Sequence, residues 1–487
     1  MKRIIHSSNL VNTFWNLLDV MIFPVVFLAL TPFFIFKLGA EEFGLWMLIN
    51  SVLASFHLMN FGLGSATQRN VARFLGRNDT ARITQTINTN LSLSLIVASA
   101  CVMVGFVLKE GVSHFGLFHL DDLVQGKAAD LMLMASFLVS LKFIEQIFQH
   151  ALKGFENFKA AAKLNLSIRF LVLTANVLWV FSGYGLYHML ATQILISLVF
   201  LLVHFQVLKR VISQYKLYLY WDRGNILDEL RYGLHTWIQS VAVIISYQMD
   251  RFIVTSFFGL TALSYYSIVA TIFNHIHMSF NALVPWLLPK VARLREQGTN
   301  VTALFFSARS FVLIVGIGSL LLFYSLSQAL FTLWLGTELY QHIQVYIQLF
   351  LVFELFFLFT SAPYFFLNAN GNQSLMTKIT WTLSLLSLSG MFLGIYFLDS
   401  IEGMIYGLIA GTVVGISIEN AWINKEVLNQ NPAKEGMMLL FPAAFASIIV
   451  LSSNPIAVAL AFVFLLFSSW YLFVKSGDFK LKVLLFG

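Results

Sequence analysis

The chain alternates long apolar runs with short polar segments along its whole length. About fourteen of the runs reach roughly 20 residues, the length that a helix needs to cross the hydrocarbon core of a bilayer. They lack the strict alternation of a membrane barrel strand. The pattern predicts transmembrane helices at roughly residues 10–37, 43–66, 84–108, 128–150, 164–183, 186–208, 232–258, 261–286, 303–326, 343–368, 379–398, 403–424, 437–452 and 455–474. The last two can also be read as one bent or re-entrant segment.

Composition agrees with this pattern. Hydrophobic residues make up 58% of the 487 positions and charged residues 11%, whereas soluble domains carry about 25% charged residues. The mean hydropathy is +0.79. The predicted fold class is therefore an all-α polytopic membrane protein. The polar segments between the runs are too short for a soluble catalytic or nucleotide-binding domain.

Basic residues are distributed unevenly between the two sides of the predicted helices. The formal net charge is +7, and with a cytoplasmic N-terminus most of the 30 Lys and Arg residues lie in or beside cytoplasmic loops. We count Arg309 among these loop cations. Lys37, Lys109 and Lys127 fall on the other side. Because cytoplasmic loops carry the excess of Lys and Arg, the distribution predicts that both termini are cytoplasmic.

An internal repeat appears at an offset of 220 residues. The aligned identities are Gly39 with Gly259, His57 with His277, and VAR at 71–73 with VAR at 291–293. Each glycine lies at a short outward turn between two predicted spans. The repeat predicts two six-helix halves around a central cavity, which is a common plan for transporters. The predicted domains are residues 1–210, residues 211–430, and residues 431–487 with two extra helices and a cytoplasmic tail.

Charged side chains inside a span are candidate functional residues, because each costs about 2.5–3.5 kcal/mol at the bilayer centre on insertion scales. The segment SYQMDRFIVTSFFG places Asp250 beside Arg251. On a helical wheel both fall on one polar face with Gln239. Sequence neighbours on a helix do not face each other. We therefore predict that Arg251 meets an anionic substrate group, and that Asp250 holds the helix through a partner on another span.

Other spans carry polar residues at helical spacing. Further substrate-binding candidates are Asn50, His57, Asn274, Asn281 and Lys142, and the ion-coupling candidates are Asp19 and Glu354. Purely structural interpretations stay open. The asparagines can be interhelical hydrogen-bond partners, the histidines can be packing residues, and Lys142 can be the partner of Glu145. The outer segment with His114, His119, Asp121 and Asp122 has no compact ligand spacing. We therefore predict neither a metal site nor a catalytic residue.

Three segments resemble a known family. LGAEEFGLWMLINSVLASFHLMNFGLGSATQRNVARFLGRND (38–79) is similar to the start of the polysaccharide transporter family, the Wzx-type flippases of lipid-linked oligosaccharides. The motif residues are Gly39, Phe43-Gly44 and Gly62-Leu63-Gly64 before Arg69 and Arg73. YQMDRFIVTSFFGLTALSYYSIVATI (247–272) and LKGFENF (152–158) resemble later parts of the family. The family belongs with multidrug exporters and lipid II flippases.

The resemblance implies a function. An undecaprenyl diphosphate-linked oligosaccharide, such as an O-antigen unit of lipopolysaccharide, is moved from the inner to the outer leaflet of a bacterial inner membrane. No cofactor is implied, and the driving force is a proton or sodium gradient. Membrane lipids, the glycan polymerase and the chain-length machinery are the implied partners. The alternatives are a lipid II flippase, a multidrug exporter or, from an enzyme class, a membrane-bound glycan polymerase or ligase.

Overall fold

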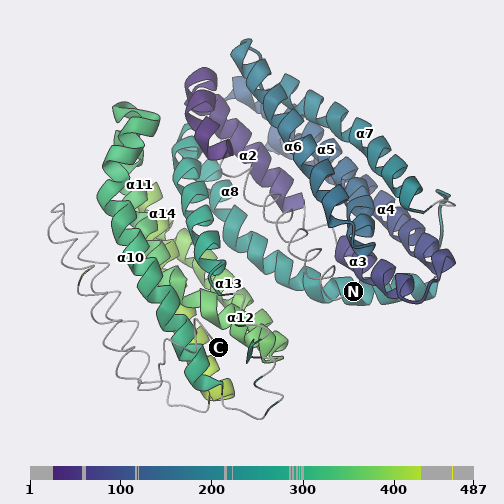
Figure 1. Cartoon of the computed structure of the whole chain (residues 1–487). Helices are drawn as coiled ribbons and strands as arrows, with labels where there is room; N and C mark the ends of the chain where they lie inside the picture. The colour runs from purple at the N-terminus through teal and green to yellow at the C-terminus, as the bar shows by residue number, and fades with distance from the viewer. Residues whose placement is uncertain are drawn as a thin grey trace. The chain divides into compact units, whose positions relative to one another are not determined.

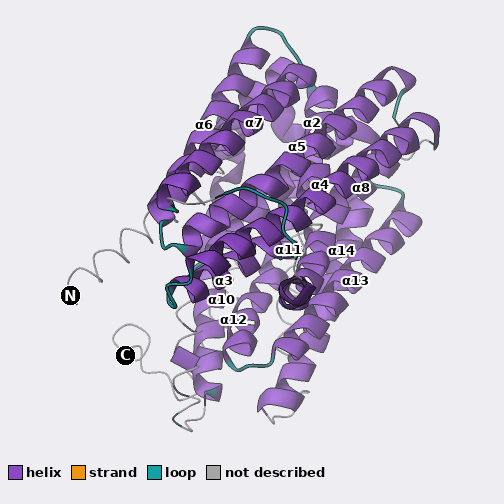
Figure 2. Ribbon diagram, turned by 90° about the vertical axis from the view of Figure 1, so that its right-hand side faces the viewer, coloured by secondary structure: helices purple, strands orange, loops and turns teal. Residues whose placement is uncertain are grey.

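The chain is described here by a computed structural model that covers residues 26–56, 62–115, 118, 120–212, 216–221, 223–284 and 301–428, with a few single positions between 287 and 297 and at 463. The regular secondary structure of these residues is helical (Figure 2). The protein is thus an all-α polytopic membrane protein, as its apolar pattern predicts. Its chain divides into two compact units. Unit 1 is Met1–Ile244 with Arg251–Ser264, and unit 2 is Ile245–Asp250 with Tyr265–Gly487.

Unit 1 is built around the long helix α5 (Asp122–Gly154). The helices that pack against α5 are α2 (Ala40–Phe56), α3 (Leu63–Leu75), α4 (Thr80–Phe115), α6 (Phe158–Phe181) and α7 (Leu186–Val211), all labelled in Figure 1. A buried cluster that includes Phe74, Ile87, Ile147 and Leu208 joins α3, α4, α5 and α7. Each of these helices therefore buries one apolar face against its neighbours.

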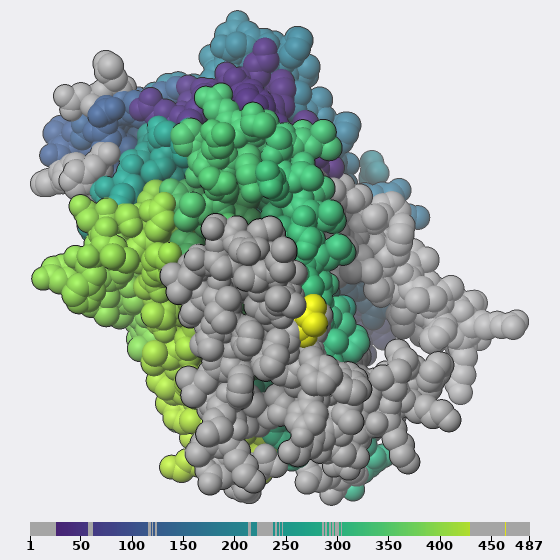
Figure 3. Space-filling model, turned by 90° about the vertical axis from the view of Figure 1, so that its left-hand side faces the viewer, coloured from purple at the N-terminus to yellow at the C-terminus, as the bar shows by residue number. Residues whose placement is uncertain are grey.

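Unit 2 contains the second series of helices. They are α10 (Thr302–Leu335), α11 (Thr337–Phe357), α12 (Ser361–Ala369), α13 (Gln373–Leu398) and α14 (Ile401–Ile423). α11 packs on both α10 and α14, and α13 and α14 pack along each other. Figure 3 shows α10 and α11 in green beside α13 and α14 in yellow-green. The chain continues from α14 into a π-helical turn, Asn424–Leu428.

Nine helices in the described part of the chain are long and apolar enough to cross a membrane. Ten predicted spans, from 84–108 to 403–424, fall on these nine helices, because the helix at Tyr247–Asn281 includes parts of two of them. The helices run past the predicted limits, as α4 does by starting at Thr80 and ending at Phe115, because helical turns extend into the polar interface. The predicted spans 437–452 and 455–474, and most of 10–37, lie outside the described residues. The domain boundary near residue 210 stays a prediction.

Two predicted spans contain a break. In span 43–66, α3 begins after Gly62, whose φ of 70° is left-handed and unsuited to a continuous helix. In span 343–368, a 3-10 turn at Leu358–Thr360 separates α11 from α12. Pro363 explains this second break, because it has no N–H for the carbonyl of Phe359 and its ring crowds that carbonyl.

The element α8 (Arg223–Asn281) comprises two helical arms that meet at Gly259, where φ is 81° and ψ is −176°. These arms are the predicted spans 232–258 and 261–286. Gly39, aligned with Gly259 by the repeat, also has a positive φ, of 82°. A Cβ atom on Gly44 of α2 would overlap the carbonyl oxygen of Leu260. Glycine at position 44 therefore lets α2 approach the α8 turn at backbone distance.

Candidate functional site

A buried hydrogen bond joins the two arms of α8. The Tyr266 hydroxyl on the second arm donates to Asp250 Oδ2 on the first at 2.7 Å. Asp250 is 8% exposed and Tyr266 is fully buried. This contact satisfies a carboxylate that would be costly to bury alone. Asp250 therefore has a partner on the next predicted span, as we expect from its position in the sequence.

Arg251 follows Asp250 on the first arm and is partly buried. Its carbonyl oxygen accepts a hydrogen bond from the Thr255 hydroxyl at 2.8 Å, within the helix. The next residue, Phe252, stacks on Phe118, with 6.2 Å between ring centroids and 23° between ring planes. This aromatic contact limits rotation of the arm about its axis. It therefore restricts the direction in which the Arg251 side chain leaves the helix.

His277 and Glu354 form a buried ionisable pair within unit 2. Imidazole Nδ1 of His277, on the second arm of α8, lies 2.8 Å from Oε1 of Glu354 on α11. The two residues are 4% and 1% exposed. Phe357 covers the imidazole, with 4.3 Å between ring centroids, and Tyr247 stands edge-on to Phe357. A carboxylate and an imidazole in contact can share one proton, and this chemistry suits ion coupling.

Lys142 is engaged by its own helix in unit 1. Its Nζ atom lies 2.7 Å from Oε2 of Glu145, which is 1% exposed, while Gln149 donates to Oε1 at 2.9 Å. Both carboxylate oxygens of Glu145 are therefore bonded. The structure thus forms the Lys142–Glu145 pair that was one of two interpretations of these residues.

The asparagine candidates are not brought together. Asn50 is exposed and donates to the carbonyl of Trp46 in its own helix at 2.9 Å. Asn274 and Asn281 are partly exposed on the second arm of α8, and within the described residues no side-chain hydrogen bond joins them. Asp19 and His57 lie outside the described residues, and so does the side chain of Gln239.

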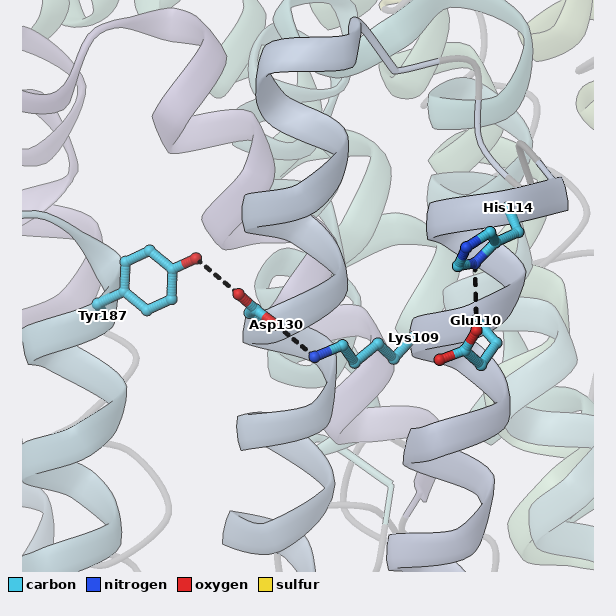
Figure 4. Close-up of polar contacts among 5 residues, drawn as sticks. All are labelled: Lys109, Glu110, His114, Asp130 and Tyr187. Carbon is cyan, nitrogen blue, oxygen red and sulfur yellow. Dashed lines mark hydrogen bonds and ion pairs between the residues drawn. The ribbon is translucent and has the colours of Figure 1, made fainter.

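A polar cluster lies where the ends of α4, α5 and α7 meet (Figure 4). Lys109 Nζ lies 2.8 Å from Asp130 Oδ1, and the Tyr187 hydroxyl donates to Asp130 Oδ2 at 3.4 Å. His114 Nδ1 lies 3.1 Å from Glu110 Oε2. In the part of the chain that is described, no three His, Cys, Asp or Glu residues are grouped as a metal site requires; His119 lies outside that part.

One assignment of the sequence analysis is wrong. Arg309, which we counted among the solvated loop cations, is 4% exposed and donates from Nη1 to Asn420 Oδ1 at 3.0 Å. The reason is its depth, since it lies seven residues inside α10. Sequence reasoning also missed Glu419 and Tyr266 as polar groups of the core. The signal for Glu419 was its place beside Asn420 in the apolar run of α14.

Comparisons with known proteins agree with this arrangement. The model of a family described as "Polysaccharide biosynthesis protein" matches residues 10–295. The lipid II flippase MurJ in an inward closed conformation has a TM-score of 0.67 at 15% identity, covering 93% of this chain and 98% of that chain. A multidrug resistance MATE family transporter of the MOP superfamily, in an inward-facing conformation, has a TM-score of 0.65 at 14% identity, covering 91% and 100%. These identities show a shared fold alone. The search of curated proteins gave no match.

Proposed function

Because the chain belongs to the polysaccharide biosynthesis protein family, we propose that it is a flippase for an undecaprenyl diphosphate-linked oligosaccharide. An O-antigen unit or a related surface glycan is moved from the inner to the outer leaflet of a bacterial inner membrane by alternating access. The family match carries this proposal. The resemblance of residues 38–79 to Wzx-type flippases supports the substrate class.

The charged residues of α8 give the proposal a physical basis. The diphosphate carries about two negative charges and the glycan many hydroxyl groups, so the head group cannot cross hydrocarbon unaided. Arg251 is suited to meet the diphosphate, because guanidinium stays charged when buried and its fork matches phosphate oxygens. Asp250, bonded to Tyr266, holds the same arm in place. The protein changes the leaflet of the glycan and none of its covalent bonds.

The proposal predicts the effect of changing Arg251. In vesicles of bacterial phospholipid with the purified full chain, an undecaprenyl diphosphate-linked oligosaccharide becomes accessible to a lectin on the opposite face. Arg251→Ala is expected to lower this rate by about tenfold or more, because it removes a charge-assisted contact worth roughly 1.5–3 kcal/mol. Arg251→Lys is expected to keep part of the rate.

The matched control is Lys163→Ala, an exposed cation at the start of α6, which should leave the rate unchanged. Folded amounts are measured in parallel by size-exclusion chromatography. Restored folding and transport on neutralising an acid together with Arg251 would assign Arg251 to a structural pair. Transport of drug cations with no movement of the glycan would favour the multidrug exporter. Movement of lipid II alone would favour the lipid II flippase, and a covalently altered glycan would favour a polymerase or ligase.

We propose that both termini lie in the cytoplasm and that the glycan polymerase and the chain-length machinery are partners. Cysteines introduced at Gly111, in the last turns of α4, and at Asp399, after α13, should react with a membrane-impermeant maleimide on intact cells after Cys101→Ala. A cysteine at Gly76, after α3, should react only after permeabilisation. Labelling of Gly76 from outside would reverse the topology and with it the proposed direction of transport.

Ion coupling is the remaining part of the proposal. We place it at Glu354, because this acid is fully buried and bonded to the imidazole of His277. Asp250 is the weaker candidate. Its partner Tyr266 donates a hydrogen bond to it, but a phenol hydroxyl, unlike an imidazole, does not take up a proton at neutral pH. Asp19 stays a candidate from the sequence. The coupling ion is a proton in this arrangement, and no cofactor is required.

A further inference from the structure

A buried polar cluster of unit 2 has no part in the function proposed so far. Arg309 comes from α10, Glu419 and Asn420 from the last turn of α14, and Asn424 from the start of the π-helical turn. All four residues are at most 5% exposed. The chain widens into its π-helical turn at Asn424, and such turns are frequent at functional sites.

Arg309 is held from two sides. Its Nη1 atom donates to Asn420 Oδ1 at 3.0 Å, and its guanidinium carbon lies 5.2 Å from the ring centroid of Phe359. Asn420 is itself fixed, because its amide nitrogen donates to the carbonyl of Ile416 at 2.9 Å. The guanidinium therefore takes a defined position between α14 and the 3-10 turn that carries Phe359.

The Glu419 carboxyl group lies beside this arginine without a direct bond to it. Neither of its oxygens accepts a hydrogen bond from any residue in the described part of the chain, although the side chain is 98% buried. Arg309 is the charged group of those residues that acts on it. Of the other acids, lysines and histidines on elements packed against α14, Glu354 is bonded to His277. The rest are exposed: Glu338, His342, Lys378, Lys425 and Glu426.

This environment allows two states of the carboxyl group. Burial without a hydrogen-bond donor favours the neutral acid, and a neighbouring guanidinium favours the carboxylate. Arg309 is bonded to Asn420 and also acts on the Glu419 carboxyl group, so a change in the Arg309 side-chain torsions can move the guanidinium from Asn420 toward Glu419. The contact of Arg309 with Asn420 is the one expected when Glu419 is neutral.

We propose that Glu419 binds and releases a proton, and that Arg309 switches from Asn420 to Glu419 when the proton leaves. The O–H bond of the acid breaks, the proton passes to water, and the resulting carboxylate takes Arg309 as its counter-ion. This inference rests on the proposed flippase function, in which Glu419 would be a second proton-carrying group in addition to Glu354. Its place in the last turns of α14 and near the start of α10 corresponds to the cytoplasmic side of the predicted topology.

Infrared difference spectroscopy tests the proton site without any transport assay. The purified full chain in lipid vesicles is moved from acidic to alkaline buffer, and the band of protonated carboxyl groups is recorded. Glu419→Gln is expected to remove one component of the band, and Glu419→Asp to keep a shifted one. Glu402→Gln, the same change at the other end of α14, is the matched control and should keep the Glu419 component.

A second variant tests the switch of Arg309 between Asn420 and Glu419. In Arg309→Gln the carboxylate loses its counter-ion, so the Glu419 component should persist to more alkaline buffer than in the wild type. An unchanged band in Glu419→Gln, or a component that moves with sodium rather than with pH, would overturn the proton site. A component whose pH dependence is the same in Arg309→Gln would overturn the switch. Failure of the glycan assay with these spectra as expected would reject the flippase function alone.

Discussion

Gly407→Val is expected to abolish the folded protein, with a loss of detergent-stable monomer of about tenfold or more. A Cβ atom at Gly407 on α14 would overlap the carbonyl oxygen of Gly390 on α13. The same holds at Gly394 against the carbonyl of Gly403, and at Gly411 against that of Leu386. Adding methylene groups to a well-packed core costs about 1–3 kcal/mol. The cost here should exceed that range, because backbone atoms cannot move aside as side chains do.

The glycines of α14 recur every fourth residue, at Gly403, Gly407, Gly411 and Gly415, and small residues at this spacing let membrane helices approach closely. The hydrogen bond between Ser387 and Thr412, at 2.9 Å, lies in the same seam. Thermal unfolding of the purified protein measures the effect. Gly126→Val is the control, since a Cβ atom there meets nothing within 4 Å. Equal stability of the two variants would show that the α13–α14 seam can open.

The glycine spacing is one of several features of this fold that can be recognised in the sequence. Long apolar runs predict helices well, because the bilayer requires each span to satisfy its own backbone hydrogen bonds. Breaks inside a run are harder to foresee. Pro363 marks the one in the span 343–368, but Gly62 is a single glycine among 29, and nothing local separates it from a glycine that lies within a helix.

The candidate site was predictable only in part, and the reason is tertiary. The sequence pointed to Asp250 by its place on a polar helix face, to His277 by the repeat, and to Glu354 as a charge inside an apolar span. It did not pair Asp250 with Tyr266, or His277 with Glu354, because these partners are 16 and 77 residues apart. The prediction that Arg309 is solvated was wrong, because it used a local feature of the sequence where tertiary contacts decide. A cation near a helix end suggests a headgroup contact, whereas neighbouring helices bury this one.

The His277–Glu354 pair leads to the second large expected effect. Glu354→Gln should reduce ion-driven transport by about tenfold or more while leaving the folded amount unchanged, because an amide can hydrogen-bond to His277 but cannot release a proton. His277→Ala should instead lower the stability, since it leaves the buried Glu354 carboxyl group without its hydrogen-bond partner, at a cost of roughly 1–3 kcal/mol or more. Thermal unfolding and the vesicle assay with an imposed pH gradient separate the two outcomes.

The double variant Glu354→Gln with His277→Asn decides what the pair does. Both residues are then able to hydrogen-bond without a charge, so folding should be near the wild-type level, unlike that of His277→Ala. Transport should stay low if the pair carries the coupling proton. Glu145→Gln is the control in unit 1, because it neutralises a carboxylate of equal burial that is bonded to Lys142; it should leave the response to the pH gradient unchanged. Full transport by the double variant would reduce His277 and Glu354 to a structural contact, and coupling would then have to be sought at Asp250 or Asp19.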